Sequence, residues 1–232
     1  STHCISSAAS DVYKRQIPIR AMICSTGLDN STITGDYTIG IKSEWLSLVG
    51  DVFGRYISGI SGDYLFHSVP YYSMSEEDLE LEEFNKLGEQ ASQGCVRLAV
   101  SDAKWVYDNC LTGTNVSIYD DAENAGPLGK PDAIKITDFT NKWDPTDSNK
   151  KCPYAKATPI ISGANDYTIK SGGEFYALAG VTAVDTCGND ITSNIEVFGN
   201  VITTRKGKYK VTYSVTDVLK RTSSVTITVT VQ

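Results

Sequence analysis

The residues best suited to covalent chemistry lie together in the run Ser92-Gln93-Gly94-Cys95-Val96-Arg97-Leu98. A cysteine reacts as its thiolate, and an unperturbed thiol has a pKa of about 8.5, so the thiol needs a base or stabilising donors. Glycine before the cysteine lets a substrate approach the backbone, and backbone N–H groups in such a turn can stabilise a thiolate or a developing oxyanion. The run therefore predicts a reactive cysteine at position 95.

One histidine is available as a base for this thiol. The chain has two histidines, and His3 lies in an opening run that we set aside, which leaves His67. It stands in Phe66-His67-Ser68-Val69-Pro70, at the end of a strand-like pattern. A neutral imidazole can take the thiol proton. Residue types alone leave a second interpretation open, in which the cysteine is a small buried hydrophobe and the histidine a surface or capped residue.

The segments around these two residues are mainly strand-like, with one clear helix. Residues 101–110 are expected to be helical, because apolar side chains recur there at the spacing of one buried helical face, at Ala103, Val106, Tyr107 and Cys110. Ser101 is the expected N-cap. A strand is expected at residues 115–119. This order places Cys95 just ahead of a helix and close to a sheet.

Two polar segments interrupt the pattern. Six of the eight residues between Glu76 and Glu83 are acidic, which favours a solvated loop with a short helix. Residues 120–152 are rich in Pro, Gly, Asp and Lys, and Trp143-Asp144-Pro145 is typical of a turn. We interpret this second segment as a linker.

Five motifs in the same order resemble those of the L,D-transpeptidase catalytic domain, the YkuD-like family. The resemblance covers residues 17–119, and five motifs in register are far more specific than any one of them. The motifs are Cys24-Ser25-Thr26-Gly27, Thr34-Gly35-Asp36-Tyr37, Phe66-His67-Ser68, the run from Ser92 to Leu98, and Asp102-Ala103 with Gly113-Thr114 before a strand.

The resemblance implies a β-sandwich catalytic domain with one or two helices and a cysteine acyl-enzyme. The cysteine would attack the carbonyl of the third residue of a peptidoglycan tetrapeptide stem and expel the terminal D-Ala. An amine of a neighbouring stem would then attack and form a 3-to-3 cross-link. Water as the acceptor would make the protein an L,D-carboxypeptidase.

The resemblance also implies roles for individual residues. The catalytic group would be Cys95 as nucleophile, His67 as base and Ser68, whose backbone carbonyl would orient the imidazole. Gly94 and Cys95 would supply oxyanion-hole N–H groups, and Arg97 would meet a substrate carboxylate or brace the loop. The predicted substrate-binding and oxyanion residues are Gly94, Gln93, Ser92, Arg97 and Tyr71, the last of which has core packing as its open alternative.

Two departures from the family pattern stand out. Members commonly carry a histidine where this chain has Gln93, and the acidic insertion lengthens the stretch between His67 and Cys95. Gln93 can still donate through its amide, so we expect tuned activity. The insertion is expected to be either a lid or a solvated loop.

Residues 158–232 have a different texture, with short alternating strands separated by turns. Valine, isoleucine and tyrosine alternate with polar residues along 208–215 and 223–231, which predicts strands with one buried face. Further strands are expected at 167–169, 175–179 and 195–198. This segment resembles the bacterial Ig-like surface modules, so we expect a small antiparallel β-sandwich that spaces the catalytic domain or docks it on a cell-wall polymer.

These observations give a domain plan of a leader foreign to the domain (1–16), a catalytic domain (17–120), a linker and domain tail (121–157) and an Ig-like domain (158–232). The leader interpretation sets aside His3 and Cys4 and implies that any signal peptide lies outside this chain. The six cysteines are too sparse for a disulfide scaffold, although a bridge between Cys152 and Cys187 and two thiols remain equally open.

Bulk properties limit the partners. The chain has 232 residues and a net charge of −7 with 21 scattered Lys and Arg, which is unlike a nucleic-acid-binding surface. No apolar run reaches the roughly 20 residues of a membrane span. We expect no cofactor and no metal, and an extracytoplasmic location at the cell wall or secreted. A catalytically inactive surface protein used for binding or spacing is the alternative from another class.

Overall fold

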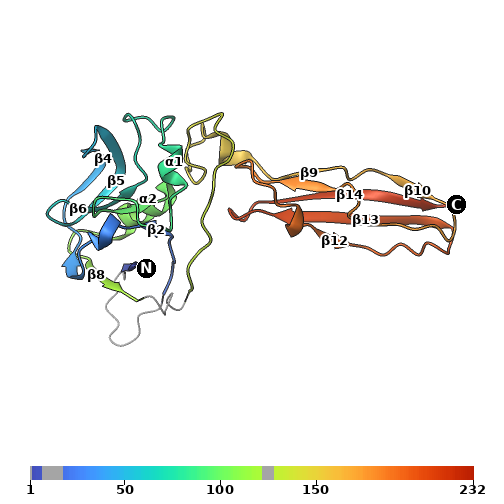
Figure 1. Cartoon of the computed structure of the whole chain (residues 1–232), viewed down its shortest axis with the longest axis horizontal. Helices are drawn as coiled ribbons and strands as arrows, with labels where there is room; N and C mark the ends of the chain where they lie inside the picture. The colour runs from blue at the N-terminus through green and yellow to red at the C-terminus, as the bar shows by residue number, and fades with distance from the viewer. Residues whose placement is uncertain (1, 7–17, 122–127) are drawn as a thin grey trace. The chain divides into compact units, whose positions relative to one another are not determined.

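The computed structural model describes residues 2–6, 18–121 and 128–232. The chain forms two compact units, one of residues 1–135 and 139–155 and the other of residues 136–138 and 156–232. Both units are built mainly from strands, which confirms the mainly β fold class. Figure 1 shows the helices and strands of both units, coloured from blue at the N-terminus to red at the C-terminus.

The first unit is organised around a five-stranded mixed sheet. Its strand order is β2-β7-β6-β5-β4, and all neighbours are antiparallel except β6 and β7, which are parallel. The strand bounds are β2 Cys24–Ser25, β4 Lys42–Leu48, β5 Val52–Ser61, β6 Tyr64–Ser68 and β7 Val96–Leu98. The parallel pair brings two segments nearly thirty residues apart in sequence side by side.

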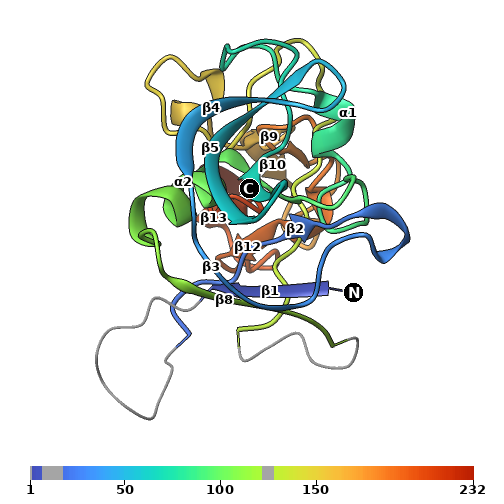
Figure 2. The same ribbon diagram turned by 90° about the vertical axis from the view of Figure 1, so that its left-hand side faces the viewer.

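A smaller sheet completes the strands of this unit, with the order β1-β8-β3. In Figure 2 its strands run side by side along the lower edge of the unit. The bounds are β1 Thr2–Ser6, β3 Gly35–Thr38 and β8 Asn115–Asp120. Of the expected leader, residues 1–16, only β1 belongs to the described part of the chain.

The helix α2, Val100–Asn109, packs on β5, β6 and β7 and closes the core of the unit. This core joins residues of the strands with Ala103, Val106 and Cys110 of the helix. The expected helix over residues 101–110 is therefore confirmed to within one residue. Lys42 caps its carboxyl end, because its Nζ donates to the carbonyls of Tyr107 and Cys110, the latter at 2.9 Å.

The expected N-cap at Ser101 is wrong. The N-cap position is Ala99, which has no side-chain cap hydrogen bond. Instead, the fully buried carboxylate of Asp144 accepts the Val100 N–H at 2.7 Å, and the Thr146 hydroxyl accepts the Ser101 N–H at 3.1 Å. Caps supplied from some 45 residues away leave no signal in the local sequence.

Residues 139–155, which the sequence assigned to a linker and domain tail, lie in this first unit. Trp143, Asp144 and Asp147 of this segment are buried. The segment thus contributes both a cap for α2 and part of the core.

Replacing Asp144 by alanine is expected to lower the free energy of unfolding by about 2 kcal/mol or more. The change removes the acceptor of three hydrogen bonds, from the Val100 N–H and from the N–H and hydroxyl of Thr146. Denaturant unfolding measures the effect. The matched control is Asp108→Ala, which removes an exposed carboxylate of the same helix. Equal unfolding midpoints for the two variants would contradict the capping role.

The acidic insertion is less solvated than expected. It contains the short helix α1, Leu81–Phe84, as the sequence indicated. However, its intermittent apolar residues are all buried, namely Leu79, Leu81, Phe84 and Leu87. The Leu79 N–H also donates to Lys142 O, which joins the insertion to the segment that caps α2.

The second unit is the expected small sandwich of two sheets, except that β10 pairs with β14 in parallel, so the sandwich is not antiparallel throughout. The four-stranded sheet has the order β10-β14-β13-β12, with β13 and β14 as its long antiparallel pair (Figure 1), and β9 and β11 form the other sheet. The bounds are β9 Ile160–Ser162, β10 Tyr167–Ile169, β11 Thr182–Val184, β12 Glu196–Phe198, β13 Gly207–Thr216 and β14 Thr222–Val231. Its core includes Ala183 of β11, Val211 of β13 and Val229 of β14. The strand expected at 175–179 is wrong, since residues 175–176 have no regular secondary structure and residues 177–179 lie in a turn.

Candidate active site

The parallel pairing of β6 and β7 sets the arrangement of the candidate catalytic residues. Phe66 pairs with Val96, and His67 pairs with Arg97. Because side chains alternate along strands, Phe66 and Val96 share one face, where they join the core closed by α2. His67 and Arg97 therefore share the opposite face.

Cys95 lies two residues before Arg97, directly ahead of β7. The alternation of β7, continued back from Arg97 by two residues, predicts that the side chain of Cys95 lies on the same face as Arg97 and His67. The guanidinium charge of Arg97 acts on both residues, since it lowers the pKa of each. The expected helix immediately after Cys95 is wrong, because β7 intervenes before α2 begins at Val100.

The imidazole of His67 is held in one orientation. Its Nδ1 lies 2.6 Å from the backbone oxygen of Ser68, the contact that the sequence led us to expect. A carbonyl oxygen only accepts, so we assign the proton to Nδ1 and leave Nε2 as the proton acceptor. Burial lowers the pKa of His67 from 6.5 to about 4, with the Ser68 contact raising it and Arg97 lowering it. The imidazole is therefore neutral at pH 7.

The thiol of Cys95 is also neutral at rest. Burial raises its pKa above 9.0 and the charge of Asp63 adds to this, whereas the Leu65 N–H and Arg97 lower it. Its Sγ lies 3.4 Å from the backbone oxygen of Asp63, to which the thiol donates. The resting pair is thus a thiol and an imidazole, unlike the ion pair of a preformed thiolate.

We expect alkylation of Cys95 by iodoacetamide to accelerate with pH up to and beyond pH 9, because only the thiolate reacts. A preformed ion pair would instead give a rate that is already at its plateau near pH 5 to 6. Peptide mass spectrometry after timed alkylation identifies the modified cysteine, and Cys95→Ser is the control that removes the signal. A plateau below pH 7 would contradict the neutral pair.

Two hydroxyl groups brace the loop that carries the thiol. The Ser92 hydroxyl accepts the Gly94 N–H at 3.0 Å and donates to Cys95 O at 2.6 Å. The Thr32 hydroxyl donates to Gly94 O at 2.8 Å and accepts the Gly27 N–H at 2.7 Å. Sequence reasoning found Ser92 but missed Thr32, which lies outside every motif. The bracing also means that the Gly94 N–H is engaged in the resting structure.

Gly94 is required at its position by the backbone. Its φ is +134°, a conformation that other residues rarely adopt, and a Cβ there would lie 2.7 Å from Cε1 of Tyr64. Tyr64 begins β6, so the ring packs directly on the loop that carries the nucleophile.

Arg97 is tied to the acidic insertion. Its Nη1 lies 2.5 Å from Oε2 of Glu83 in α1, and Glu83 also pairs with Lys86. The Nε of Arg97 is buried and has no hydrogen-bond partner. The ion pair with Glu83 is a contact of the bracing kind. The other role that we expected for Arg97, binding of a substrate carboxylate, stays a prediction.

The two remaining predicted residues differ in exposure. Gln93 is exposed beside the nucleophile. Tyr71 is fully buried, with its ring 5.3 Å from that of Trp45 in an edge-to-face contact. Tyr71 therefore packs in the core, and its assignment to a substrate groove is corrected.

Arg55 is a supporting residue that the sequence did not single out. Its N–H donates to the Ser68 hydroxyl at 2.9 Å, and its buried guanidinium pairs with Asp147 at 3.0 Å and Glu76 at 3.1 Å. This cluster joins β5, the insertion and the capping segment behind the His67-Ser68 strand. Each partner comes from a different part of the chain, so no spacing in the sequence indicates it.

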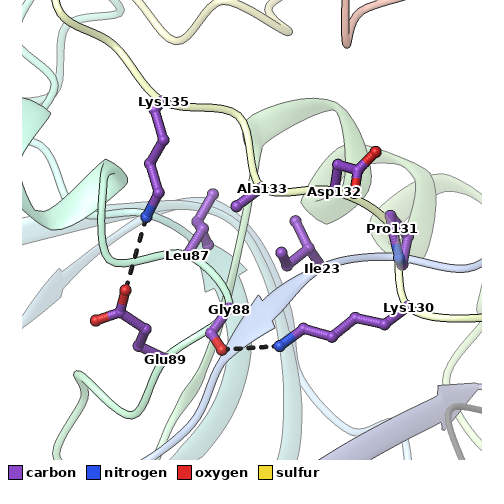
Figure 3. Close-up of a pocket in the computed structure, with 9 residues that line it drawn as sticks. All are labelled: Ile23, Leu87, Gly88, Glu89, Lys130, Pro131, Asp132, Ala133 and Lys135. Atoms are coloured by element: carbon purple, nitrogen blue, oxygen red, sulfur yellow. Dashed lines mark hydrogen bonds and ion pairs between the residues drawn. The ribbon is translucent and has the colours of Figure 1, made fainter.

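A separate hollow lies near the edge strand β2, with a volume of about 400 Å³. The Nζ of Lys130 donates to Gly88 O at 3.1 Å, and the Nζ of Lys135 lies 3.7 Å from Oε1 of Glu89. Figure 3 marks both contacts with dashed lines. None of its lining residues belongs to the predicted site. Across the described ranges, no group of three or more His, Cys, Asp or Glu side chains is placed to hold a metal ion.

Comparisons with known proteins place both units. Residues 4–118 match the family described as the L,D-transpeptidase catalytic domain, YkuD, and residues 159–231 match the family described as the bacterial surface protein Ig-like domain. The protein named "Putative L,D-transpeptidase YciB" of Bacillus subtilis (strain 168) is 37% identical over 108 residues, which are 43% of this chain and 55% of that protein. The chain thus spans about half the length of this curated relative.

Solved structures with similarity to parts of the chain include an L,D-transpeptidase from Mycobacterium smegmatis. It is 20% identical, with 42% of this chain and 47% of that chain covered and a TM-score of 0.34. Another is a fused Zn-dependent amidase/peptidase/peptidoglycan-binding domain-containing protein from Clostridium acetobutylicum ATCC 824. It is 33% identical, with 40% and 36% covered and a TM-score of 0.29.

The fold and the site define a chain of two units, in which a helix-backed mixed sheet with a histidine on β6 and a cysteine directly ahead of β7 precedes an Ig-like sandwich. The family matches assign each of the two parts of the chain to a family. The chain carries an L,D-transpeptidase catalytic domain followed by a bacterial surface Ig-like domain.

Proposed function

We propose that this protein is a peptidoglycan L,D-transpeptidase that forms 3-to-3 cross-links through an acyl-enzyme on Cys95. The observation that carries the proposal is that Cys95 directly precedes β7, the parallel neighbour of the strand β6 that holds His67, and that Nδ1 of His67 lies 2.6 Å from Ser68 O. Because Nδ1 faces the Ser68 carbonyl, the basic Nε2 on the other side of the ring faces away from that carbonyl. The family match of residues 4–118 supports the same activity.

In the proposed acylation step, Nε2 of His67 takes the thiol proton as Sγ of Cys95 attacks the carbonyl of the third stem residue. The C–S bond forms, and the tetrahedral intermediate collapses with loss of the C–N bond to the terminal D-Ala. The imidazolium returns its proton to the departing amine. Because the imidazole is neutral over the physiological range, it can accept a proton in each turnover.

The oxyanion would be stabilised by the loop around the nucleophile. The Gly94 N–H already donates to the Ser92 hydroxyl, so its use would require that this contact be exchanged when substrate binds. The Cys95 N–H is therefore the donor that we favour from this loop. Arg97, fixed by Glu83 beside the thiol, would meet a stem carboxylate with the donors that Glu83 does not engage.

The Ig-like domain would hold the enzyme at its polymer substrate, and the proposed location is extracytoplasmic. The family of this domain is described by its occurrence in bacterial surface proteins. None of the described helices has both the length and the apolar character of a membrane span.

The same residues would also serve an L,D-carboxypeptidase, in which water replaces the acceptor amine. A third possibility, an inactive surface protein, requires that Cys95 fails to acylate. The residues that brace the cysteine loop, Ser92 and Thr32, favour a working site, because a structural cysteine needs no such bracing.

Mass spectrometry of the full chain after incubation with a disaccharide-tetrapeptide tests the proposal. We expect an adduct on Cys95 with the mass of the stem after loss of one D-Ala. A second stem should then yield a dimer linked between third residues, whereas release of the tripeptide alone identifies the carboxypeptidase. The absence of an adduct and of any product would exclude both activities.

A further inference from the structure

A two-residue turn between β5 and β6 lies directly beside the thiol. Ser61 pairs with Tyr64, which leaves Gly62 and Asp63 as the turn, and the φ of +53° at Gly62 suits the first position of such a hairpin. The backbone oxygen of Asp63 lies 3.4 Å from Sγ of Cys95. The ring of the next residue, Tyr64, packs on Gly94, which directly precedes Cys95. The turn therefore forms a wall of the space around the nucleophile.

The side chain of Asp63 brings an unneutralised negative charge to this wall. Asp63 is exposed, and among the residues that the structure describes it has no cationic partner. The charge is close enough to Cys95 to oppose formation of its thiolate. Such a placement works against the nucleophile itself, so it is unexplained by the acylation step.

Charges of opposite sign thus lie around the thiol. Arg97 follows Cys95 by two residues on β7 and is fixed by Glu83, whereas Asp63 belongs to the turn of the neighbouring hairpin. A carboxylate that faces solvent beside a reactive sulfur attracts cations to that sulfur and repels anions.

We propose that the Asp63 carboxylate is a binding subsite for a primary ammonium group, through which the acceptor amine is brought to the acyl-enzyme. This inference rests on the proposed function, because it assigns the second half of that reaction. The carboxylate attracts a cationic acceptor and has no such effect on water. Asp63 therefore raises the fraction of acyl-enzyme that forms a cross-link relative to the fraction that is hydrolysed.

The second half of the proposed reaction is aminolysis of the thioester on Cys95. The bound ammonium releases one proton to solvent, and the neutral amine attacks the thioester carbonyl. A C–N bond forms and the C–S bond breaks. The second amine proton passes through His67 to the departing sulfur, which restores the thiol. Asp63 binds the cation and exchanges no proton in this step.

The first experiment needs no enzymatic activity. Cys95 of the full chain is modified with two methanethiosulfonates, one carrying an aminoethyl cation and one a sulfonatoethyl anion. In each case the thiolate forms a disulfide and releases methanesulfinate. The ratio of the two rates at Cys95, followed by peptide mass spectrometry, reports the local charge independently of thiol ionisation.

Asp63→Asn is expected to lower this cation-to-anion rate ratio between about 3- and 10-fold at low salt, and the difference should shrink at high salt. The matched control is Asp51→Asn, which removes the same charge from the turn at the opposite end of β5. Asp63→Glu should restore the ratio. An unchanged ratio in Asp63→Asn, or an equal fall in both Asn variants, would overturn the subsite.

The second experiment follows the acyl-enzyme. With the stem adduct formed on Cys95, the fraction that transfers to an amine acceptor, relative to hydrolysis, should fall in Asp63→Asn and persist in Asp51→Asn and Asp63→Glu. Equal partition in all of them would overturn the inference. Failure of the wild-type chain to acylate would instead reject the proposed function, while the reagent ratio still decides whether Asp63 attracts cations.

Discussion

Cys95→Ala is expected to abolish acyl-enzyme formation, and Cys95→Ser to reduce it by at least about 10³-fold. Alanine has no nucleophile. A serine hydroxyl is far harder to ionise than a thiol, and the resting environment of Cys95 already raises the pKa of the thiol. A neutral imidazole with a pKa of about 4 is too weak a base to activate the alcohol to the same extent.

Adduct formation with the tetrapeptide stem, measured by intact-protein mass spectrometry, checks this expectation. The control is Cys187→Ala, which removes a buried thiol from the Ig-like unit and leaves the catalytic sheet unchanged. Thermal melting of each variant confirms that the fold persists. Adduct formation by Cys95→Ala at the wild-type rate would remove Cys95 from the mechanism.

The sequence located the reactive run and the main elements because both depend on local patterns. The apolar spacing along residues 101–110 identified α2, and the alternation along residues 208–215 and 223–231 identified β13 and β14. Cys95 and His67 stood out as residue types in recognisable motifs. The strand pairing that unites these two residues could not be derived from those patterns.

Contacts between distant segments account for what the sequence missed. Thr32 lies 62 residues from the carbonyl that it holds, and the Asp144 carboxylate lies 44 residues from the helix that it caps. The acidic stretch around Glu83 had the composition of a solvated loop, yet its interspersed leucines are buried and its carboxylate fixes Arg97. Tyr71 was predicted to line a groove, but it is buried by contacts with Trp45 and the insertion. Its neighbours in sequence do not indicate these contacts.

The bridge between Cys152 and Cys187 that the sequence left open would join the two units, and it stays a prediction. Cys152 is buried in the first unit and Cys187 in the second. Burial raises the pKa of Cys187 to about 12, with the charge of Asp185 adding to the shift. That thiol is therefore far less reactive than an exposed one near neutral pH.

His67→Ala is expected to lower the acylation rate between about 10² and 10⁴-fold, which is the usual contribution of a general base. The mutant should also change the pH dependence. In the wild type the imidazole is in its basic form at every pH well above 4, so the rate should be nearly level from pH 6 to 8. Without the base, only ionised thiol attacks, and the logarithm of the rate should rise by about one for each pH unit below the raised pKa of Cys95.

Single-turnover acylation from pH 6 to 9 measures both effects on one preparation. His67→Gln is the companion variant, because it fills most of the space of the buried imidazole and cannot act as a base at these pH values. Loss of rate in both variants, with a melting temperature for His67→Gln close to that of the wild type, separates base catalysis from packing. If His67→Gln acylates at the wild-type rate with a level pH profile, the Nε2 proton acceptor is not used, and the proton of Cys95 leaves by another route.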